Sequence, residues 1–432
     1  MSNRKSKNAL AHFHSSDLHA VARLATQATL AVTDMAEGVH QAVQRSVGAA
    51  DGAAAGRTSG LTGLIYSSVR GVSRWVGEGV LEALRRLEPM LARLQGQGDE
   101  SPERAAVLAA LNGVMGDRLQ ASANPLATPM TLRLNGRVVC SQAPPVAGPS
   151  TARPLSVAPV APIDAGVVSG RVLIVVHGLC MNDLQWHGEH GGKPVNHAQA
   201  IAQALGYTPV YLRYNSGLHV SQNGRLLAQQ LDDLIKTWPV PVSCVSVLAH
   251  SMGGLVARSA LQLATHDGLS WPAQLKHLLF LGTPHHGAPL ERAGNWVDVL
   301  LGSTPYSRPF AKLGQLRSAG VTDLRYGHVQ DSDWQGHDRF RRKPDSRTPL
   351  PLPDGVACFA IAATLAAKRS RVADRLVGDG LVPLPSALGQ HPDAQRQLHF
   401  APGHQRVVYR TSHMQLLSDP AITKQLIQWL TL

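Results

Sequence analysis

The segment Val242–Thr265 constrains the fold of this chain more than any other part of it. It opens with an apolar run that is typical of a buried strand, Val242–Leu248, and closes with a helical pattern, Gly253–Thr265. Only a short stretch, AHSMGG, with Ser251 near its centre, connects the two patterns. The turn that it makes has to be sharp, and it leaves the Ser251 side chain at its tip.

The remainder of residues 170–432 alternates in the same way between short apolar runs and longer helical patterns. The predicted strands are Arg171–Val176, Val210–Tyr214, Val242–Leu248, Leu275–Leu281, Val356–Ala362 and Arg406–Tyr409. The predicted helices are Ala198–Leu205, Gly224–Thr237, Gly253–Thr265 and Pro420–Leu430. This alternation predicts an α/β domain, in which helices cover both faces of a mostly parallel, doubly wound sheet.

Two regions precede this domain. Residues 1–122 are rich in Ala, Gly and Arg, and their apolar residues recur at helical spacing, so we predict an N-terminal helical region, either a hairpin or a small bundle. Ser101-Pro102 marks the start of its last helix. Residues 123–169 contain many prolines and predict a stiff linker. A short hairpin is expected within it at Met130–Val139, because Asn135-Gly136 is a hairpin turn signal.

Residues 288–350 interrupt the α/β domain without a strand pattern, and they predict a cap or lid. An ordinary excursion of helices and loops is the alternative. His and Asp residues gather near the end of this insertion: His328, Asp331, Asp333, His337 and Asp338. Their spacing matches no defined metal motif, so we interpret them as surface residues and keep a metal site as the alternative.

The formal net charge of +12 suits contact with nucleic acid or anionic lipid, but no nucleic-acid-binding motif accompanies it. We therefore expect a solvated basic surface, no nucleic-acid partner and no cofactor or metal. Neither a secretory signal nor a run of about 18 apolar residues is evident, which favours a cytoplasmic protein without a transmembrane helix. The amphipathic N-terminal helices suit either peripheral contact with a lipid surface or self-association.

Ser251 is the candidate nucleophile, because the strand-turn-helix context exposes its Oγ above a sheet and points the Met252 N–H at a developing oxyanion. A second oxyanion N–H is expected from Leu179, in the loop His177-Gly178-Leu179-Cys180 after the first predicted strand of the α/β domain. Gly178 lets that loop approach a substrate, whereas a simple strand-end turn is the alternative interpretation.

The base is expected after the last strand, where His413 stands; His404 precedes that strand and is expected at the surface. Asp379, between two glycines, is the candidate acid that orients His413, with Asp374 and Asp354 as competitors. We also expect five residues to line the substrate pocket: His177, Gly178, His250, His285 and His286.

Several segments together resemble the α/β-hydrolase lipases, most closely the bacterial triacylglycerol lipases and the GPI-inositol-deacylase-like branch. The segments are His177-Gly178-Leu179, Ala249–Gly254, Gly282–Gly287 and Asp379–Pro383. The resemblance spans roughly residues 165–432 and implies a serine esterase or lipase with Ser251, Asp379 and His413 as its triad. Ala249 stands where G-x-S-x-G has its first glycine, which is a mild departure because alanine is nearly as small.

The main functional hypothesis is hydrolysis of carboxylic esters, including lipid esters, through an acyl-enzyme. An acyltransferase would use the same residues, with an alcohol in place of water. A non-catalytic protein that binds a surface or partner through residues 1–122 is the third hypothesis.

Overall fold

The computed structural model describes residues 102–142, 160–288, 318–336, 345–368 and 378–432, together with Ser67 and Arg70 in a helix. The chain divides into two compact units, Met1–Arg104 with Asn124–Leu126, and Ala105–Ala123 with Ala127–Leu432. The helical pattern that we predict before residue 101 lies outside the described residues, apart from Ser67 and Arg70. The following description concerns the second unit.

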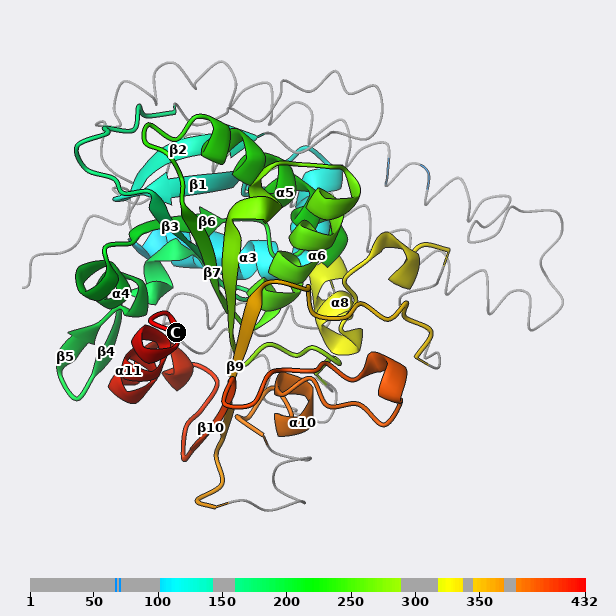
Figure 1. Cartoon of the computed structure of the whole chain (residues 1–432). Coiled ribbons are helices and arrows are strands. Elements are labelled where there is room, and N and C mark those ends of the chain that lie inside the picture. The colour runs from blue at the N-terminus through cyan, green and yellow to red at the C-terminus, as the bar shows by residue number, and fades with distance from the viewer. Residues whose placement is uncertain are drawn as a thin grey trace, which may run out of the picture. The chain divides into compact units, whose positions relative to one another are not determined.

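An eight-stranded sheet forms the centre of the second unit, in the order β10-β9-β8-β7-β3-β6-β1-β2 (Figure 1). The six strands from β10 to β6 run parallel, and the hairpin β1–β2 adds antiparallel strands at the other edge. The strands are β1 (Met130–Leu134), β2 (Arg137–Gln142), β3 (Arg171–Val176), β6 (Thr208–Arg213), β7 (Cys244–His250), β8 (Leu275–Leu281), β9 (Ala357–Thr364) and β10 (Gln405–Tyr409). A separate small sheet pairs β4 (Gly188–His190) with β5 (Lys193–Val195).

Alternating side chains of β3 belong to two different hydrophobic cores, because successive residues of a strand point to opposite faces of the sheet. Val172 and Ile174 belong to the core that includes residues of α5 (Val220–Lys236) and α6 (Met252–His266). Leu173 and Val175 belong to the core that includes residues of α4 (His197–Leu205) and α11 (Pro420–Trp429). The parallel, doubly wound sheet that the sequence predicts is therefore confirmed.

All six predicted strands and all four predicted helices are present, with ends that differ by a few residues. The largest difference is at α5, which starts at Val220 rather than at Gly224. The backbone N–H of His219 donates to Gln222 Oε1 at 3.2 Å, which caps the helix earlier. Gly224 instead lies where α5 meets α6, because a Cβ there would lie 2.4 Å from Ser259 Oγ.

The predicted hairpin exists, with positive φ at both Asn135 (49°) and Gly136 (78°), as a two-residue hairpin turn requires. It is a structural part of the main sheet, however, and does not lie within a linker. Leu132 of β1 pairs with Leu212 of β6, and both side chains are fully buried. The pairing of β1 with β6 is not predictable from the Pro-rich pattern, because it joins segments that are far apart in the sequence. Within residues 123–169, the stretch 143–159 lies outside the described residues.

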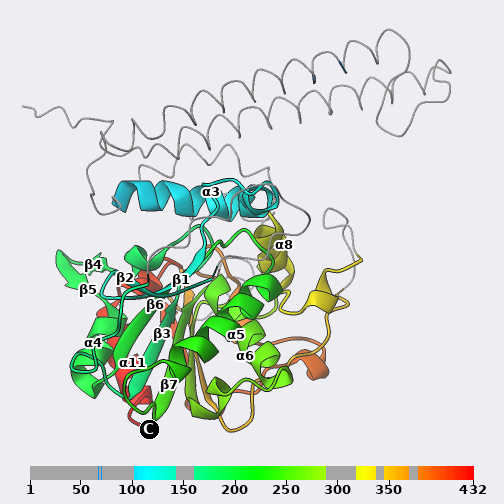
Figure 2. The same ribbon diagram turned by 90° about the horizontal axis from the view of Figure 1, so that it is seen from above.

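Helix α3 (Pro102–Ala121) kinks at Met115, and from Ala105 onward it belongs to the same compact unit as the sheet. Figure 2 shows it alongside the sheet, with α8 (Ala319–Tyr326) near one of its ends. Ser318 Oγ donates to Gly113 O at 2.7 Å, and the Ala319 N–H donates to Asp117 Oδ2 at 3.1 Å. The last predicted helix of the N-terminal region thus packs as part of the α/β unit.

The region that we predict as a cap is described only at residues 318–336 and 345–350; residues 289–317 and 337–344 lie outside the described residues. Helix α8 connects to the start of α5 through Asp323, a buried carboxylate that accepts hydrogen bonds from His219 Nδ1, the Val220 N–H and His328 Nδ1. A short helix, α10 (Leu384–Ala387), follows Asp379 in the chain. Within the described residues, no helix combines the length and apolar character that crossing a bilayer requires.

Leu132→Ala tests whether the hairpin is part of the stable core of this unit. Because Leu132 is fully buried between β6 and the helices of one core, we expect the substitution to lower the free energy of unfolding by about 3 kcal/mol. Urea denaturation measures this, with the exposed hairpin residue Arg137→Ala as the control, for which we expect a change below about 0.5 kcal/mol. A loss of less than about 1 kcal/mol for Leu132→Ala would show that the hairpin contributes little to this core.

Candidate active site

Ser251 occupies a backbone conformation that few residues other than glycine adopt, with φ 54° and ψ −127°. It stands between the last residue of β7 and the first residue of α6. A Cβ at Gly253 would lie 2.6 Å from His177 O, and one at Gly254 would lie 2.1 Å from Thr283 Oγ1. The glycines after Ser251 are therefore needed so that α6 can pack directly against the neighbouring strand ends, as the sharp turn in the sequence predicts.

His413 and Asp379 form a buried pair. His413 Nδ1 lies 2.7 Å from Asp379 Oδ2, and the His413 N–H donates to Asp379 O at 2.9 Å. The other carboxylate oxygen, Oδ1, accepts the backbone N–H groups of Leu381 and Val382 at 3.0 and 2.7 Å. Because an ionised carboxylate only accepts hydrogen bonds, His413 Nδ1 carries the proton and Nε2 presents a lone pair. Asp379 thus holds the ring in the tautomer that a general base requires.

His413 packs beside the turn that carries Ser251. The ring of His250, which precedes Ser251, lies 4.6 Å from the His413 ring between centroids, and His250 Nε2 lies 3.1 Å from His413 O. A Cβ at Gly282, which follows the strand next to β7, would lie 3.2 Å from His413 Cε1. Ser251 Oγ and His413 Nε2 are buried, and neither has a hydrogen-bond partner among the described residues.

The loop after β3 runs past Ser251. A Cβ at Gly178 would lie 3.0 Å from the Cβ of Ser251, which is tighter than side chains ordinarily pack, so the loop passes very close to Ser251. Leu179 follows in the loop and is fully buried. The chain then turns at Cys180, which has a φ of 59° and donates its N–H to Ser216 Oγ at 3.0 Å. Met252 is the first residue of α6, where a helix leaves its N–H without an acceptor in the preceding turn.

His177 and His250 are structural neighbours of this site. Tyr214 stacks on His177 at 4.3 Å between ring centroids, and its OH donates to His177 O at 2.9 Å. Burial lowers the pKa of His177 to about 4, and it lowers the pKa of His250 well below the ordinary 6.5, with His413 lowering it further. Both imidazoles are therefore neutral near pH 7 and add no charge beside Ser251.

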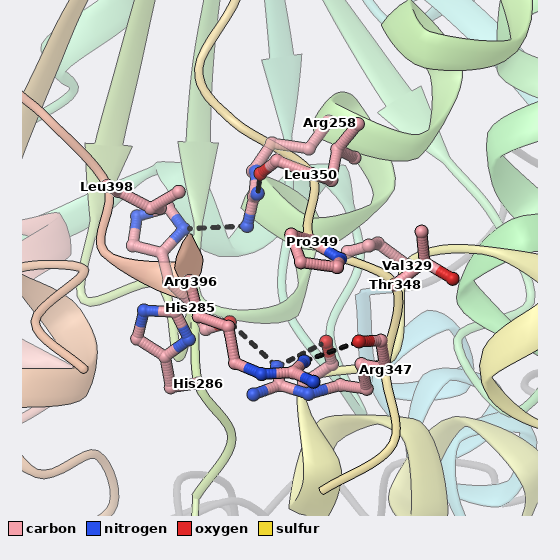
Figure 3. Close-up of a pocket in the computed structure, with 11 residues that line it drawn as sticks. Arg258, His285, His286, Val329, Arg347, Thr348, Pro349, Leu350, Arg396 and Leu398 are labelled. Carbon is pink, nitrogen blue, oxygen red and sulfur yellow. Dashed lines mark hydrogen bonds between the residues drawn. The ribbon is translucent and has the colours of Figure 1, made fainter. Parts of the chain in front are cut away.

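His285 and His286 are in the loop after β8. They line a small cavity with Arg258, Arg347 and Arg396, and neither Ser251 nor His413 belongs to its lining (Figure 3). The loop after β8 turns back toward α8, where the Ala288 N–H donates a hydrogen bond to Leu324 O. The sequence shows that this loop follows a strand beside β7, but it does not show which way its side chains turn.

The His and Asp residues of the insertion have structural partners. His328 Nδ1 lies 3.0 Å from Asp323 Oδ1, Arg225 forms an ion pair with Asp331, and Asp333 accepts the N–H groups of Val329 and Gln330. His337 and Asp338 lie outside the described residues. Of the competing acids, Asp354 is exposed and Asp374 also lies outside the described residues. His404 is partly exposed and contacts Cys358 O, away from Ser251.

Helix α3 supports the loop after β3, and the sequence does not predict this contact. A Cβ at Gly113 of α3 would lie 2.2 Å from Cys180 Sγ and 2.9 Å from Cys180 N. Asn215 Nδ2, in the loop after β6, donates to Gly116 O at 3.0 Å. Burial raises the pKa of Cys180 to about 12, so its thiol packs as a neutral group. The available signal for this contact was the pair Gly113 and Gly116, three residues apart in α3. Glycines at that spacing lie on one side of a helix and allow another backbone to approach closely.

Residues 167–340 match the family model of the PGAP1-like alpha/beta domain. Among solved structures, the chain is similar to the mature lipase BlEst2 of Bacillus licheniformis (20% identity, TM-score 0.37, 60% of this chain and 91% of that one). It is also similar to the phospholipase PlaB of Legionella pneumophila (19% identity, TM-score 0.32, 51% and 46%) and to the NocB thioesterase domain (13% identity, TM-score 0.34, 61% and 94%). A comparison with curated proteins gave no match.

The family match, the order of the parallel strands and the sharp turn at Ser251 agree with one another. Together they show that the second unit has the α/β-hydrolase fold.

Proposed function

We propose that this protein hydrolyses carboxylic esters, with Ser251 as nucleophile, His413 as general base and Asp379 as the group that orients His413. The observation that carries the proposal is the buried His413–Asp379 pair at 2.7 Å, packed beside the turn that presents Ser251. A serine at such a turn, a histidine with a free Nε2 and a carboxylate on Nδ1 are the three parts that acyl transfer requires.

In the proposed reaction, His413 Nε2 takes the proton of Ser251 Oγ as the oxygen attacks the ester carbonyl. The tetrahedral intermediate collapses, the C–O bond to the alcohol breaks, and His413 returns the proton to the leaving alkoxide. Water then attacks the acyl-enzyme with the same base, which releases the acid and restores Ser251. Asp379 stabilises the imidazolium that forms in each half of the reaction.

Two backbone N–H groups are proposed to hold the oxyanion, those of Leu179 and Met252. Met252 is the first residue of α6, so its N–H lies at the positive end of the helix dipole. This position favours the negative charge that develops on the oxyanion. Leu179 lies between Gly178, which passes Ser251, and Cys180, which α3 contacts through Gly113. Because Cys180 has a strained positive φ, we infer that the close packing of α3 keeps the Leu179 N–H in position.

The proposed substrates are carboxylic esters with an apolar acyl group, including lipid esters. The segments around Ser251 and Asp379 support this class, because they resemble those of lipases. An assay of p-nitrophenyl esters from acetate to palmitate defines the acyl length. The same assay with an added alcohol separates hydrolysis from acyl transfer to that alcohol.

Ser251→Ala is expected to reduce ester hydrolysis by about 10⁵-fold or to background, because the nucleophile is lost while the fold needs only a small residue there. The rate with p-nitrophenyl esters measures this, and a fluorophosphonate probe should label the wild type at Ser251 only. Ser243→Ala, at an exposed serine just before β7, is the matched control and should keep full activity. Equal activity of wild type and Ser251→Ala would refute the proposed nucleophile.

Asp379→Asn is expected to lower kcat by about 10⁴-fold with a small change in KM. The amide can still accept the N–H groups of Leu381 and Val382, so the loop is retained, but it no longer stabilises the imidazolium or fixes its tautomer. Steady-state kinetics measures the effect, with the exposed Asp354→Asn as control. A loss below about tenfold would contradict the assignment of the acid.

Gly113→Ala is expected to lower kcat by roughly 10- to 100-fold at nearly constant KM, because the added Cβ displaces Cys180 and with it the Leu179 N–H. Val107→Ala, on the same helix and only partly buried, is the matched control and should keep kcat within about twofold. Thermal unfolding of both variants separates a general loss of stability from a change in the loop. Unchanged kcat for a folded Gly113→Ala protein would show that α3 has no part in holding the loop.

A further inference from the structure

Both ring nitrogens of His177, the residue that follows β3, are bonded to backbone groups. His177 Nδ1 lies 2.9 Å from Gly178 O, and the Tyr214 N–H lies 3.4 Å from His177 Nε2. A carbonyl oxygen only accepts hydrogen bonds and a backbone N–H only donates them. His177 Nδ1 therefore carries the ring proton and donates to Gly178 O, whereas Nε2 accepts from Tyr214.

The bond to Gly178 O also fixes the direction of the Leu179 N–H. The two groups belong to one peptide unit, which is planar and trans, so the oxygen and the N–H point to opposite sides. His177 holds the oxygen toward its own ring, and the N–H points away from that ring. Among the described residues, nothing accepts this N–H. It is thus a free donor directly beside Gly178, the residue that passes close to Ser251.

Tyr214, the first residue after β6, holds the ring of His177 in place. The two rings stack at 4.3 Å between centroids with an angle of 20° between their planes, and the Tyr214 OH donates to His177 O at 2.9 Å. The ring, the hydroxyl and the backbone N–H of Tyr214 all contact His177, which is fully buried. Burial lowers the pKa of His177 to about 4, so near pH 7 Nε2 keeps the lone pair that accepts the Tyr214 N–H.

We propose that His177 and Tyr214 are positioning residues for the oxyanion hole, because together they set the direction of the Leu179 N–H. The inference rests on the proposed ester hydrolysis and names residues that act in it without contacting the substrate. His177 has no ring nitrogen left to bind a substrate, because backbone groups use both. A donor that is already held in direction needs no reorientation when the negative charge forms, which is the condition for efficient stabilisation of an oxyanion.

Two substitutions of His177 separate the donor from the ring. His177→Phe fills the space of the ring but cannot donate to Gly178 O, and we expect it to lower kcat by about 100-fold at nearly constant KM. His177→Asn is smaller, but its amide can still donate from near the position of Nδ1, and kcat should stay within about tenfold of the wild type. A residue that only fills the core would give the opposite order of kcat.

The control for His177→Phe is His277→Phe, at a half-buried histidine near the start of β8 and so at the other end of the sheet from Ser251. It should keep kcat within about twofold. Thermal unfolding of every variant shows which of them are folded, and kcat is compared only among those.

Tyr214→Phe keeps the stacked ring and the backbone N–H but removes the bond to His177 O, and we expect it to lower kcat by about tenfold at nearly constant KM. Tyr211→Phe, on β6, loses only the hydroxyl that contacts Asn196 and is the matched control. Because Tyr214→Phe changes a single oxygen, it tests the inference even if His177→Phe does not fold. Equal kcat for Tyr214→Phe and the wild type would remove Tyr214 from the inference.

The rate at which a fluorophosphonate labels Ser251 is the second measurement. Negative charge also develops on the phosphoryl oxygen during this reaction, and the rate does not depend on the choice of ester. We expect His177→Phe to slow labelling by about the same factor as kcat. If the wild type is not labelled at Ser251, the proposed hydrolysis fails together with this inference. If the wild type is labelled and a folded His177→Phe protein reacts equally fast, or if His177→Asn is no more active than His177→Phe, the inference alone is overturned.

Discussion

The close packing around the turn at Ser251 is the constraint on which the rest of the structure depends. Gly253 and Gly254 have no space for a side chain, because the ends of β3 and β8 contact the first turn of α6. This contact sets where α6 starts, and therefore where the Met252 N–H and the Ser251 side chain point. It also brings the loops after β3 and β8 to the same edge of the sheet, where the carboxyl ends of parallel strands meet and α/β proteins place their ligands.

The parts of this arrangement that have local signals are predictable from the sequence. The strand, turn and helix around Ser251 are contiguous, and the order of Ser251, Asp379 and His413 follows from a fold that the alternation of elements already predicts. The pairing of His413 with Asp379 was predicted in this way, and their atoms lie at hydrogen-bond distance. Their roles in catalysis stay a proposal until Ser251, Asp379 and His413 are tested.

Features that depend on contacts between distant segments were not predictable. The hairpin turn at Asn135-Gly136 was recognised, but its pairing with β6 is fixed by buried side chains on both strands rather than by the turn. The contact of Gly113 with Cys180 depends in the same way on a segment that the composition assigned to another region. The orientation of His285 and His286 is set by the return of their loop to α8, which no local pattern encodes.

The position of β1 in the sheet also affects how the chain folds during synthesis. β1 and β2 leave the ribosome before every other strand of the sheet, and they form a hairpin whose inner edge has no partner until β6 has been made. Throughout that interval the apolar side chains of β1 and its free backbone groups are accessible to other chains, and an unpaired strand edge is a site for aggregation. The hairpin can join the sheet only after β6 has been made, although its own residues precede β3 and β6 in the sequence.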